Sequence, residues 1–298
     1  MATGSMTVAE TNETDASIRD TLFADVQLAL PTRFLSWCMY KLTRVEAPWF
    51  KDRFIRFFLR LFPQIDLSEA ELTRGEDYKS FNHFFTRALK PGTRNLAPEP
   101  AVICPVDGTI SQLGQIESGR IFQAKGHSYS AAELLGSAEN ATAFENGEFA
   151  TIYLAPYNYH RIHMPVGGVL KYWRYVPGRL FSVNAATARA MPNLFARNER
   201  VIAVFDTPRG PLAMVLVGAL FVGSMETVWS GLITPPHKRE DDSGNYESMS
   251  AVTLARGQEM GRFNMGSTVI LLTGPKAVAW DSALKPGDAV RLGQKLGF

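Results

Sequence analysis

The 298-residue chain contains little of what points to several common protein classes. It has only two cysteines, Cys38 and Cys104, without a CxxC pair or zinc-ligand spacing, which argues against a disulfide framework and a metal site and favours a reducing compartment. No run reaches the roughly 18 apolar residues that a membrane-spanning helix needs. The formal net charge is only +2, so the overall balance indicates no nucleic-acid partner.

The distribution of charge is more informative than its total. Residues 33–62 hold seven basic and two acidic residues, a net charge of +5, together with nine aromatic residues. On a helical wheel from Trp49 to Phe62 these residues separate onto opposite faces, with Phe50, Phe54, Phe57 and Leu61 on one and Asp52, Arg53, Arg56 and Arg60 on the other. Such a helix suits a membrane surface, but it equally suits packing on the protein's own core with the arginines in water.

The rest of the chain predicts an α+β protein with a β-rich core. Residues 1–20 are read as a disordered tail, because they carry four acidic residues against Arg19 alone and match no targeting peptide. From about Ala101, β-branched runs alternate with glycine and proline, which is typical of strands and turns. Short helices are expected over residues 130–135 and 184–190. Residues 286–290 and 293–297 predict a tight hairpin that closes a β-barrel or sandwich.

Three polar clusters could carry chemistry. Asp107 precedes a glycine, which most often marks a turn. His160 and His163 are two of only five histidines, and they lie in a tyrosine-rich segment bounded by proline. Each alone is more often structural, but as a pair they are candidates for proton transfer. Ser267 follows Gly266 at the start of an apolar run, where Gly-Ser-Thr is commonly a turn, and the Gly-x-Ser-x-Gly pattern of a nucleophile elbow is absent.

Taken together, these clusters resemble the bacterial type of phosphatidylserine decarboxylase, a pyruvoyl-dependent enzyme family. The resemblance covers most of the chain after about residue 75 and rests on seven stretches in family order. They are FNHFF (81–85), PVDG (105–108), AKGHSY (124–129), YHRIHMP (159–165), PNLFARNER (192–200), VGSMETVW (222–229), and GQEMGRF running through to MGST (257–268). One departure is Met265, where the family usually has leucine; the two are close in volume and polarity, so no functional change is expected.

The resemblance implies that the chain cuts itself between Gly266 and Ser267. The Ser267 hydroxyl would attack the Gly266 carbonyl, and the resulting ester would break down to leave a pyruvoyl group, derived from Ser267, as the cofactor. A serine hydroxyl needs a base at neutral pH, and His163 fits that role with Asp107 to orient and charge-stabilise its imidazole. The small chain would have 298 − 266 = 32 residues.

The resemblance also implies the second reaction and its setting. Phosphatidylserine would form a Schiff base with the pyruvoyl group, lose carbon dioxide and become phosphatidylethanolamine, with His160 as the candidate acid that protonates the carbanion. The expected organisation is a tail (1–20), a helical membrane-associating segment (21–75) and a catalytic domain (76–298). The expected partners are an anionic membrane surface and the cleaved large and small chains, paired and dimerising further. The expected location is peripheral, on the cytoplasmic face of the inner membrane.

Two rival readings stay open at this point. A Ser-His-Asp hydrolase would use Ser267, His163 and Asp107 for acyl transfer in an intact chain of 33 kDa. A non-enzymatic β-barrel adaptor at a membrane would need none of the three residues, so Ser267→Ala would change nothing measurable.

Overall fold

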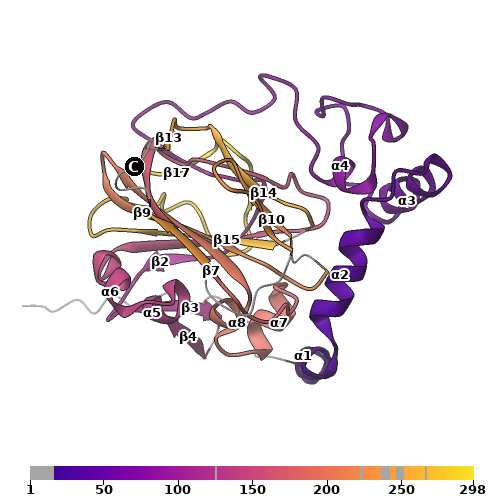
Figure 1. Ribbon diagram of the computed structural model, residues 1–298. Helices are drawn as coiled ribbons and strands as arrows, with labels where there is room; N and C mark the ends of the chain where they lie inside the picture. The colour runs from indigo at the N-terminus through magenta and orange to yellow at the C-terminus, as the bar shows by residue number, and fades with distance from the viewer. Residues whose placement is uncertain (1–16, 125, 222–223, 236–241, 246–251, 266) are drawn as a thin grey trace, which may run out of the picture.

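The computed structural model describes residues 17–298 except 125, 222–223, 236–241, 246–251 and 266. An arm of helices precedes a strand-rich body, as the α+β prediction expects (Figure 1). The expectation of a tail over residues 1–20 is wrong at its end, because Ser17 caps a helix through a capping box with Asp20. The arm consists of α1 (Ile18–Ala29), α2 (Thr32–Leu42), α3 (Pro48–Leu61), the 3₁₀ turn η1 (Gly75–Asp77) and α4 (Phe81–Phe85).

Helix α3 confirms the predicted helix, and it has two different apolar faces. One face carries Ile55 and Phe58, which are buried against α4, where Phe58 and Phe81 have ring centroids 5.0 Å apart. The other face leaves Trp49 69% and Phe57 60% exposed beside the arginines. Core packing therefore accounts for one apolar face of α3 and leaves the other in solvent. Within the described residues, no helix has both the length and the apolar character required to cross a bilayer.

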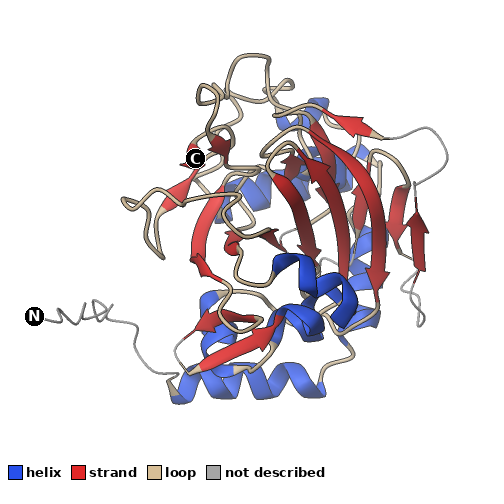
Figure 2. Ribbon diagram, turned by 90° about the vertical axis from the view of Figure 1, so that its left-hand side faces the viewer, coloured by secondary structure: helices blue, strands red, loops and turns tan. Residues whose placement is uncertain are grey.

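The strands form one large sheet and a smaller one that packs on it, and Figure 2 shows most strands side by side as one curved sheet. The large sheet runs in the order β12 (Asp242–Asn245), β7 (Gly168–Val176), β8 (Arg200–Thr207), β9 (Gly210–Val217), β15 (Ser267–Thr273), β5 (Glu148–Leu154), β2 (Gly108–Gln115) and β16 (Ala289–Val290), with β13 (Thr253–Leu254) also on β7. The small sheet runs β11 (Gly231–Thr234), β10 (Met225–Thr227), β14 (Glu259–Phe263) and β6 (Arg161–His163).

The remaining elements complete the body. Two strand pairs stand apart from these sheets: β1 (Val102–Ile103) with β17 (Lys295–Gly297), and β3 (Arg120–Ala124) with β4 (His127–Ser130). The helices are α5 (Ala131–Leu135), α6 (Ala138–Ala141), η2 (Thr142–Phe144), α7 (Ala185–Ala190) and α8 (Leu194–Arg197). The predictions of helices over 130–135 and 184–190 are confirmed, because Ser130 and Asn184 cap α5 and α7.

The predicted barrel closure is wrong. The order of the large sheet ends at β12 on one side and β16 on the other, and these two strands do not pair within the described part of the chain. The predicted C-terminal hairpin is also wrong, since β16 pairs with β2 and β17 pairs with β1. Alternation of apolar residues indicates that strands exist, but it does not determine which distant strand each one joins.

Strand β15 lies in the middle of the large sheet and is buried on both faces. It pairs along its length with β5 and along most of it with β9. Val269 and Leu271 contribute to the core shared with the small sheet, and Ile270 and Leu272 to the core beneath α5, α7 and α8. The predicted strand after Ser267 is thus the central strand of a layered fold, and residue 267 is held at its first position.

Candidate active site

Ser267 is fully buried at the start of β15, opposite Leu154 of β5. Its hydroxyl oxygen, Oγ, has no hydrogen-bond partner among the described residues. A buried hydroxyl without a partner costs roughly 1–3 kcal/mol, so folds tend to keep one only where it has a use. Gly266, the other residue of the predicted cleavage site, lies outside the described residues.

A cavity of about 210 Å³ lies beside Ser267. Its walls are mainly apolar: α3 contributes Phe58, Phe62 follows directly after α3, α4 contributes Phe85, and Phe221 adds a side chain that is 40% exposed. The cavity therefore joins the serine to the helical arm of the molecule. Water-poor walls of this kind strengthen electrostatic interactions with any group that reacts inside.

His160 belongs to the same region, because its ring lies 4.1 Å from that of Phe85, centroid to centroid. The ring is fully buried, its Nδ1 donates to the Asn158 carbonyl at 2.8 Å, and its Nε2 has no partner among the described residues. Burial, followed by the positive charge of Arg87, lowers the pKa of His160 to about 3. The imidazole is therefore neutral, with an unshared electron pair on Nε2.

His163 lies on β6 with both ring nitrogens in hydrogen bonds. Nδ1 lies 2.8 Å from the Gly257 carbonyl, which can only accept, so Nδ1 carries the proton. Nε2 therefore accepts from the Tyr159 hydroxyl, 3.0 Å away. Burial lowers the pKa of His163, and burial raises the pKa of Tyr159, so the ring is neutral and the phenol stays protonated. The imidazole is therefore fixed by Gly257, and its basic nitrogen faces the Tyr159 hydroxyl.

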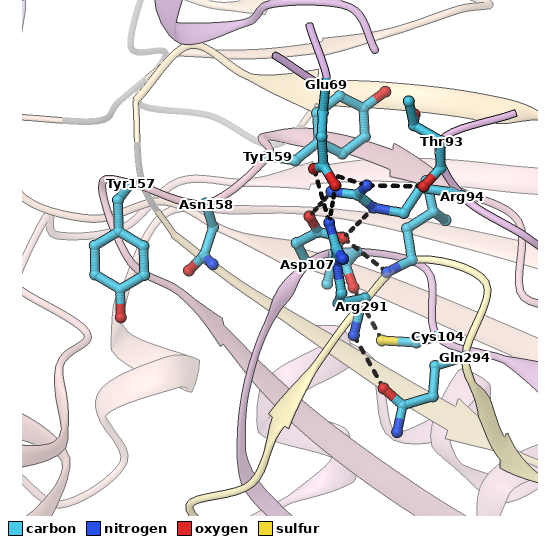
Figure 3. A network of polar contacts seen from close by, with 12 residues as sticks. Glu69, Thr93, Arg94, Cys104, Asp107, Tyr157, Asn158, Tyr159, Arg291 and Gln294 are labelled. Carbon is cyan, nitrogen blue, oxygen red and sulfur yellow. Dashed lines mark hydrogen bonds and ion pairs between the residues drawn. The ribbon is translucent and has the colours of Figure 1, made fainter. Parts of the chain in front are cut away.

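Asp107 lies in a network of ion pairs (Figure 3). Arg94 binds its carboxylate with two nitrogens, at 2.5 and 3.1 Å, and the Leu292 backbone N–H donates to it at 2.8 Å. Arg94 in turn binds Glu69 at 2.9 Å, and Glu69 also pairs with Arg291. This network links the segment before β1 to the C-terminal residues after β16.

The four predicted side chains lie in two groups, one with Ser267 and His160 and the other with His163 and Asp107. Ser267 and His160 meet at Phe85, which touches the cavity and the imidazole. His163 and Asp107 lie near each other, because the backbone N–H of His163 donates to the carbonyl of Pro105, two residues before Asp107. No hydrogen bond among the described residues joins Asp107 to His163, and the ring is oriented by Gly257 instead.

Sequence reasoning missed several residues that support the site. Arg87 is 5% exposed and donates to the carbonyls of Tyr157 and Asn158, which fixes the segment that carries His160. Arg94 was also missed, although it holds Asp107 from thirteen residues upstream. An arginine among many in a sequence gives no sign of its burial, so only three-dimensional placement reveals either role.

The chain is similar to known proteins over most of its length. A family model described as "Phosphatidylserine decarboxylase" matches residues 81–298, and a second one, described as "PSD", matches residues 22–63. The chain is 55% identical to the phosphatidylserine decarboxylase proenzyme of Pseudomonas aeruginosa (strain LESB58), over 95% of this chain and 98% of that protein. It is 53% identical to the proenzyme of Nitrosococcus oceani, over 96% and 94% respectively.

Proposed function

Because this chain belongs to the phosphatidylserine decarboxylase family, we propose that it converts phosphatidylserine to phosphatidylethanolamine after cutting itself between Gly266 and Ser267. The observation that carries the proposal is the buried Ser267 hydroxyl, which has no partner among the described residues and lies beside a cavity at the head of the central strand. Relatives named as proenzymes support a chain that must be processed. The proposal is favoured over a hydrolase that acts as an intact chain.

The self-cleavage is chemistry of the chain's own residues. The Ser267 oxygen bonds to the Gly266 carbonyl carbon, the peptide C–N bond breaks, and the hydroxyl proton passes to the freed nitrogen of residue 267. Loss of the Cα proton of residue 267 then expels the Gly266 carboxylate and leaves a carbon–carbon double bond. The resulting enamine takes a proton on Cβ and becomes an imine. Water then adds to the imine carbon and ammonia departs, which leaves a pyruvoyl group on the small chain.

His163 is the base that we assign to the first of these steps. It is neutral, and its Nε2 electron pair faces a hydroxyl that can give way or relay a proton. Burial disfavours the imidazolium that forms when the proton is taken, and the negative charges of Glu259 and then Asp107 offset part of this effect. Arg94 fixes the position of the Asp107 carboxylate.

Residue 267 suits a prosthetic group because β5 and β9 hold its strand on both sides. Once formed, a pyruvoyl group supplies an electron-accepting carbonyl that takes up the electrons left as carbon dioxide departs. We assign proton delivery in this second reaction to His160 Nε2. Since the ring is neutral, Nε2 must first take up a proton before it can donate one to the substrate carbon.

The arm gives the enzyme a means to reach a lipid. Large apolar side chains of α1, α2 and α3 face solvent, namely Leu22, Phe23, Val26, Phe34, Trp37, Trp49, Phe57 and Leu61. Arg53, Arg56 and Arg60 are exposed on α3 beside them and complement an anionic surface. We therefore assign a peripheral position on the cytoplasmic face of the inner membrane, with side chains of the arm lining the cavity beside Ser267.

Chemical sensitivity separates the decarboxylase from the hydrolase. Purified protein incubated with phosphatidylserine vesicles is expected to release carbon dioxide and form phosphatidylethanolamine. Hydrazine or borohydride should abolish this activity, because both attack a ketone, whereas a serine-directed inhibitor should leave it intact. Sensitivity to the serine reagent, with resistance to both carbonyl reagents, would instead identify a hydrolase.

Phe57→Ala is expected to weaken binding to phosphatidylserine vesicles by roughly 10- to 150-fold, since inserting one large apolar side chain contributes on the order of 1.5–3 kcal/mol. Phe298→Ala is the matched control: that ring is 54% exposed, close to the 60% of Phe57, but it lies at the C-terminus, far from α3 (Figure 1). Vesicle sedimentation measures both, and raised salt should weaken the remaining binding. An equal loss of vesicle binding in the two variants would show that the arm does not contact the membrane.

A further inference from the structure

Asn264 lies three residues before Ser267 and is almost completely buried, with 3% of its surface exposed. Its side chain makes three hydrogen bonds, which use both amide N–H groups and the oxygen. Nδ2 donates to Ser224 Oγ and Glu226 Oε1, both at 2.9 Å, while Oδ1 accepts from Asn82 Nδ2 at 3.1 Å. Its backbone N–H donates to the Ser224 carbonyl at 2.9 Å. These four contacts are called the Asn264 clamp below.

The partners in the clamp are themselves fixed. Glu226 lies on β10 directly opposite Arg262 of β14, and Arg262 Nε donates to its second carboxylate oxygen at 2.8 Å. Asn82 lies on α4, and its backbone N–H donates to the Thr43 carbonyl at 2.8 Å. The clamp therefore ties one point of the chain to the small sheet and to the helical arm, and that point cannot shift without breaking several bonds.

The chain beyond the clamp departs from ordinary backbone geometry. Met265 has a φ of +150°, a value that residues with a side chain rarely adopt and that glycine tolerates. Two residues later Ser267 is fixed by its pairing with Leu154 in the central sheet. The chain is thus held at Asn264 and at Ser267, and the strained Met265 lies between them, one residue before the bond proposed to break.

We propose that Asn264 is a positioning residue for self-cleavage: the clamp holds Met265 in its strained conformation and so prepares the Gly266–Ser267 bond for attack. This inference rests on the proposed function and adds a residue to it. A conformation maintained by tertiary contacts raises the energy of the intact chain, and the cut would release it by separating Met265 from strand β15, which begins at Ser267. The clamp does not touch Ser267, so its effect is exerted through the backbone.

The test uses the full chain made by cell-free translation, with the fraction cleaved followed over time by intact mass. Asn264→Asp keeps the shape of the side chain but replaces both donors by a charge facing Glu226. It is expected to slow cleavage by roughly 10- to 100-fold. Adding Glu226→Gln to that variant restores a donor–acceptor pair with the roles reversed, and should recover most of the rate.

Gln123→Glu is the matched control, because it makes the same amide-to-acid change in a buried side chain. Gln123 is 1% exposed and bonded to Ala188, Met191 and Leu194, away from the clamp. Thermal unfolding of each variant in a Ser267→Ala background separates lost stability from lost positioning. Equal slowing by Gln123→Glu at matched stability would overturn the inference, as would wild-type cleavage in Asn264→Asp.

Hydroxylamine measures the first step of cleavage, the formation of the ester, separately from the overall cut. It cleaves the ester but not the peptide, so it reports how much chain has undergone the first step. The proposal expects hydroxylamine-dependent cleavage of Asn264→Asp to fall by the same factor as spontaneous cleavage. A wild-type hydroxylamine rate in that variant would show that the clamp does not act on the attack. A wild-type chain that never splits would refute the proposed function itself, which is a distinct outcome.

Discussion

Replacing Ser267 by alanine is expected to leave one intact chain of 298 residues with decarboxylase activity at background. Alanine has no oxygen to attack the preceding carbonyl, so neither the cut nor the pyruvoyl group can form. The wild-type protein should instead give two masses, from chains of 266 and 298 − 266 = 32 residues. Because the side chain is buried and its oxygen lacks a partner among the described residues, the variant should fold without a lost hydrogen bond.

Thr268→Val is the matched control for that experiment. Thr268 is the next residue of β15 and is also buried, and its hydroxyl also has no partner among the described residues. Successive side chains on a strand point to opposite faces, so this hydroxyl cannot substitute for that of Ser267. The valine variant should still be cut. If the Ser267→Ala chain splits between the same residues, the assignment of the nucleophile is wrong.

His163→Ala is expected to slow self-cleavage by roughly 10²- to 10⁴-fold, the usual contribution of a general base. The pH dependence follows from burial, which lowers the pKa of His163 below its ordinary value of 6.5. A lowered pKa keeps Nε2 unprotonated in mildly acidic solution. The wild-type cleavage rate should therefore stay on its plateau as pH falls through 6.5 and decline only at more acidic pH. Intact mass after timed incubation measures both effects.

His160→Gln separates the two histidines. The variant should be processed at close to the wild-type rate but decarboxylate poorly, because its assigned proton transfer belongs to the second reaction. The His163→Ala chain should show the opposite order of defects. A fully processed but inactive His163→Ala protein would move His163 to the second reaction, and a decline in wild-type cleavage already at pH 7 would contradict a buried neutral base.

The local parts of this fold could be predicted from sequence, since their causes are local. Helix α3 follows from the spacing of its aromatic residues, and α5 follows from Ser130 and Glu133 at its start. The strand order of the large sheet could not be predicted, because it depends on distant pairings such as that of β15 with β5, more than a hundred residues upstream. The same limit explains the wrong hairpin, whose two strands each pair with a strand near the start of the catalytic part.

In the candidate site, too, some features could be predicted from the sequence and others could not. Ser267 at a strand entrance was visible in the sequence, because a Gly-Ser-Thr run preceded an unbroken apolar segment. The surroundings of Asp107 were not, since its partners Arg94 and Leu292 lie 13 residues before it and 185 residues after it. The order of motifs along the sequence identifies the residues expected to take part in the chemistry. It does not give the contacts that hold them in place, and those contacts set proton locations and backbone strain.

The central position of β15 affects how the protein folds before the cut and unfolds after it. If the cut falls before Ser267, the middle strand of the large sheet passes to a separate short polypeptide, held there by pairing with β5 and β9 and by burial on both faces. Folding must then precede cleavage, because a separate small chain would otherwise have to insert between β5 and β9 as the central strand. Unfolding the mature enzyme becomes a dissociation that depends on protein concentration, whereas the uncut precursor unfolds as one body. Once unfolded, the cut enzyme would have to bring two separate chains back together in order to refold.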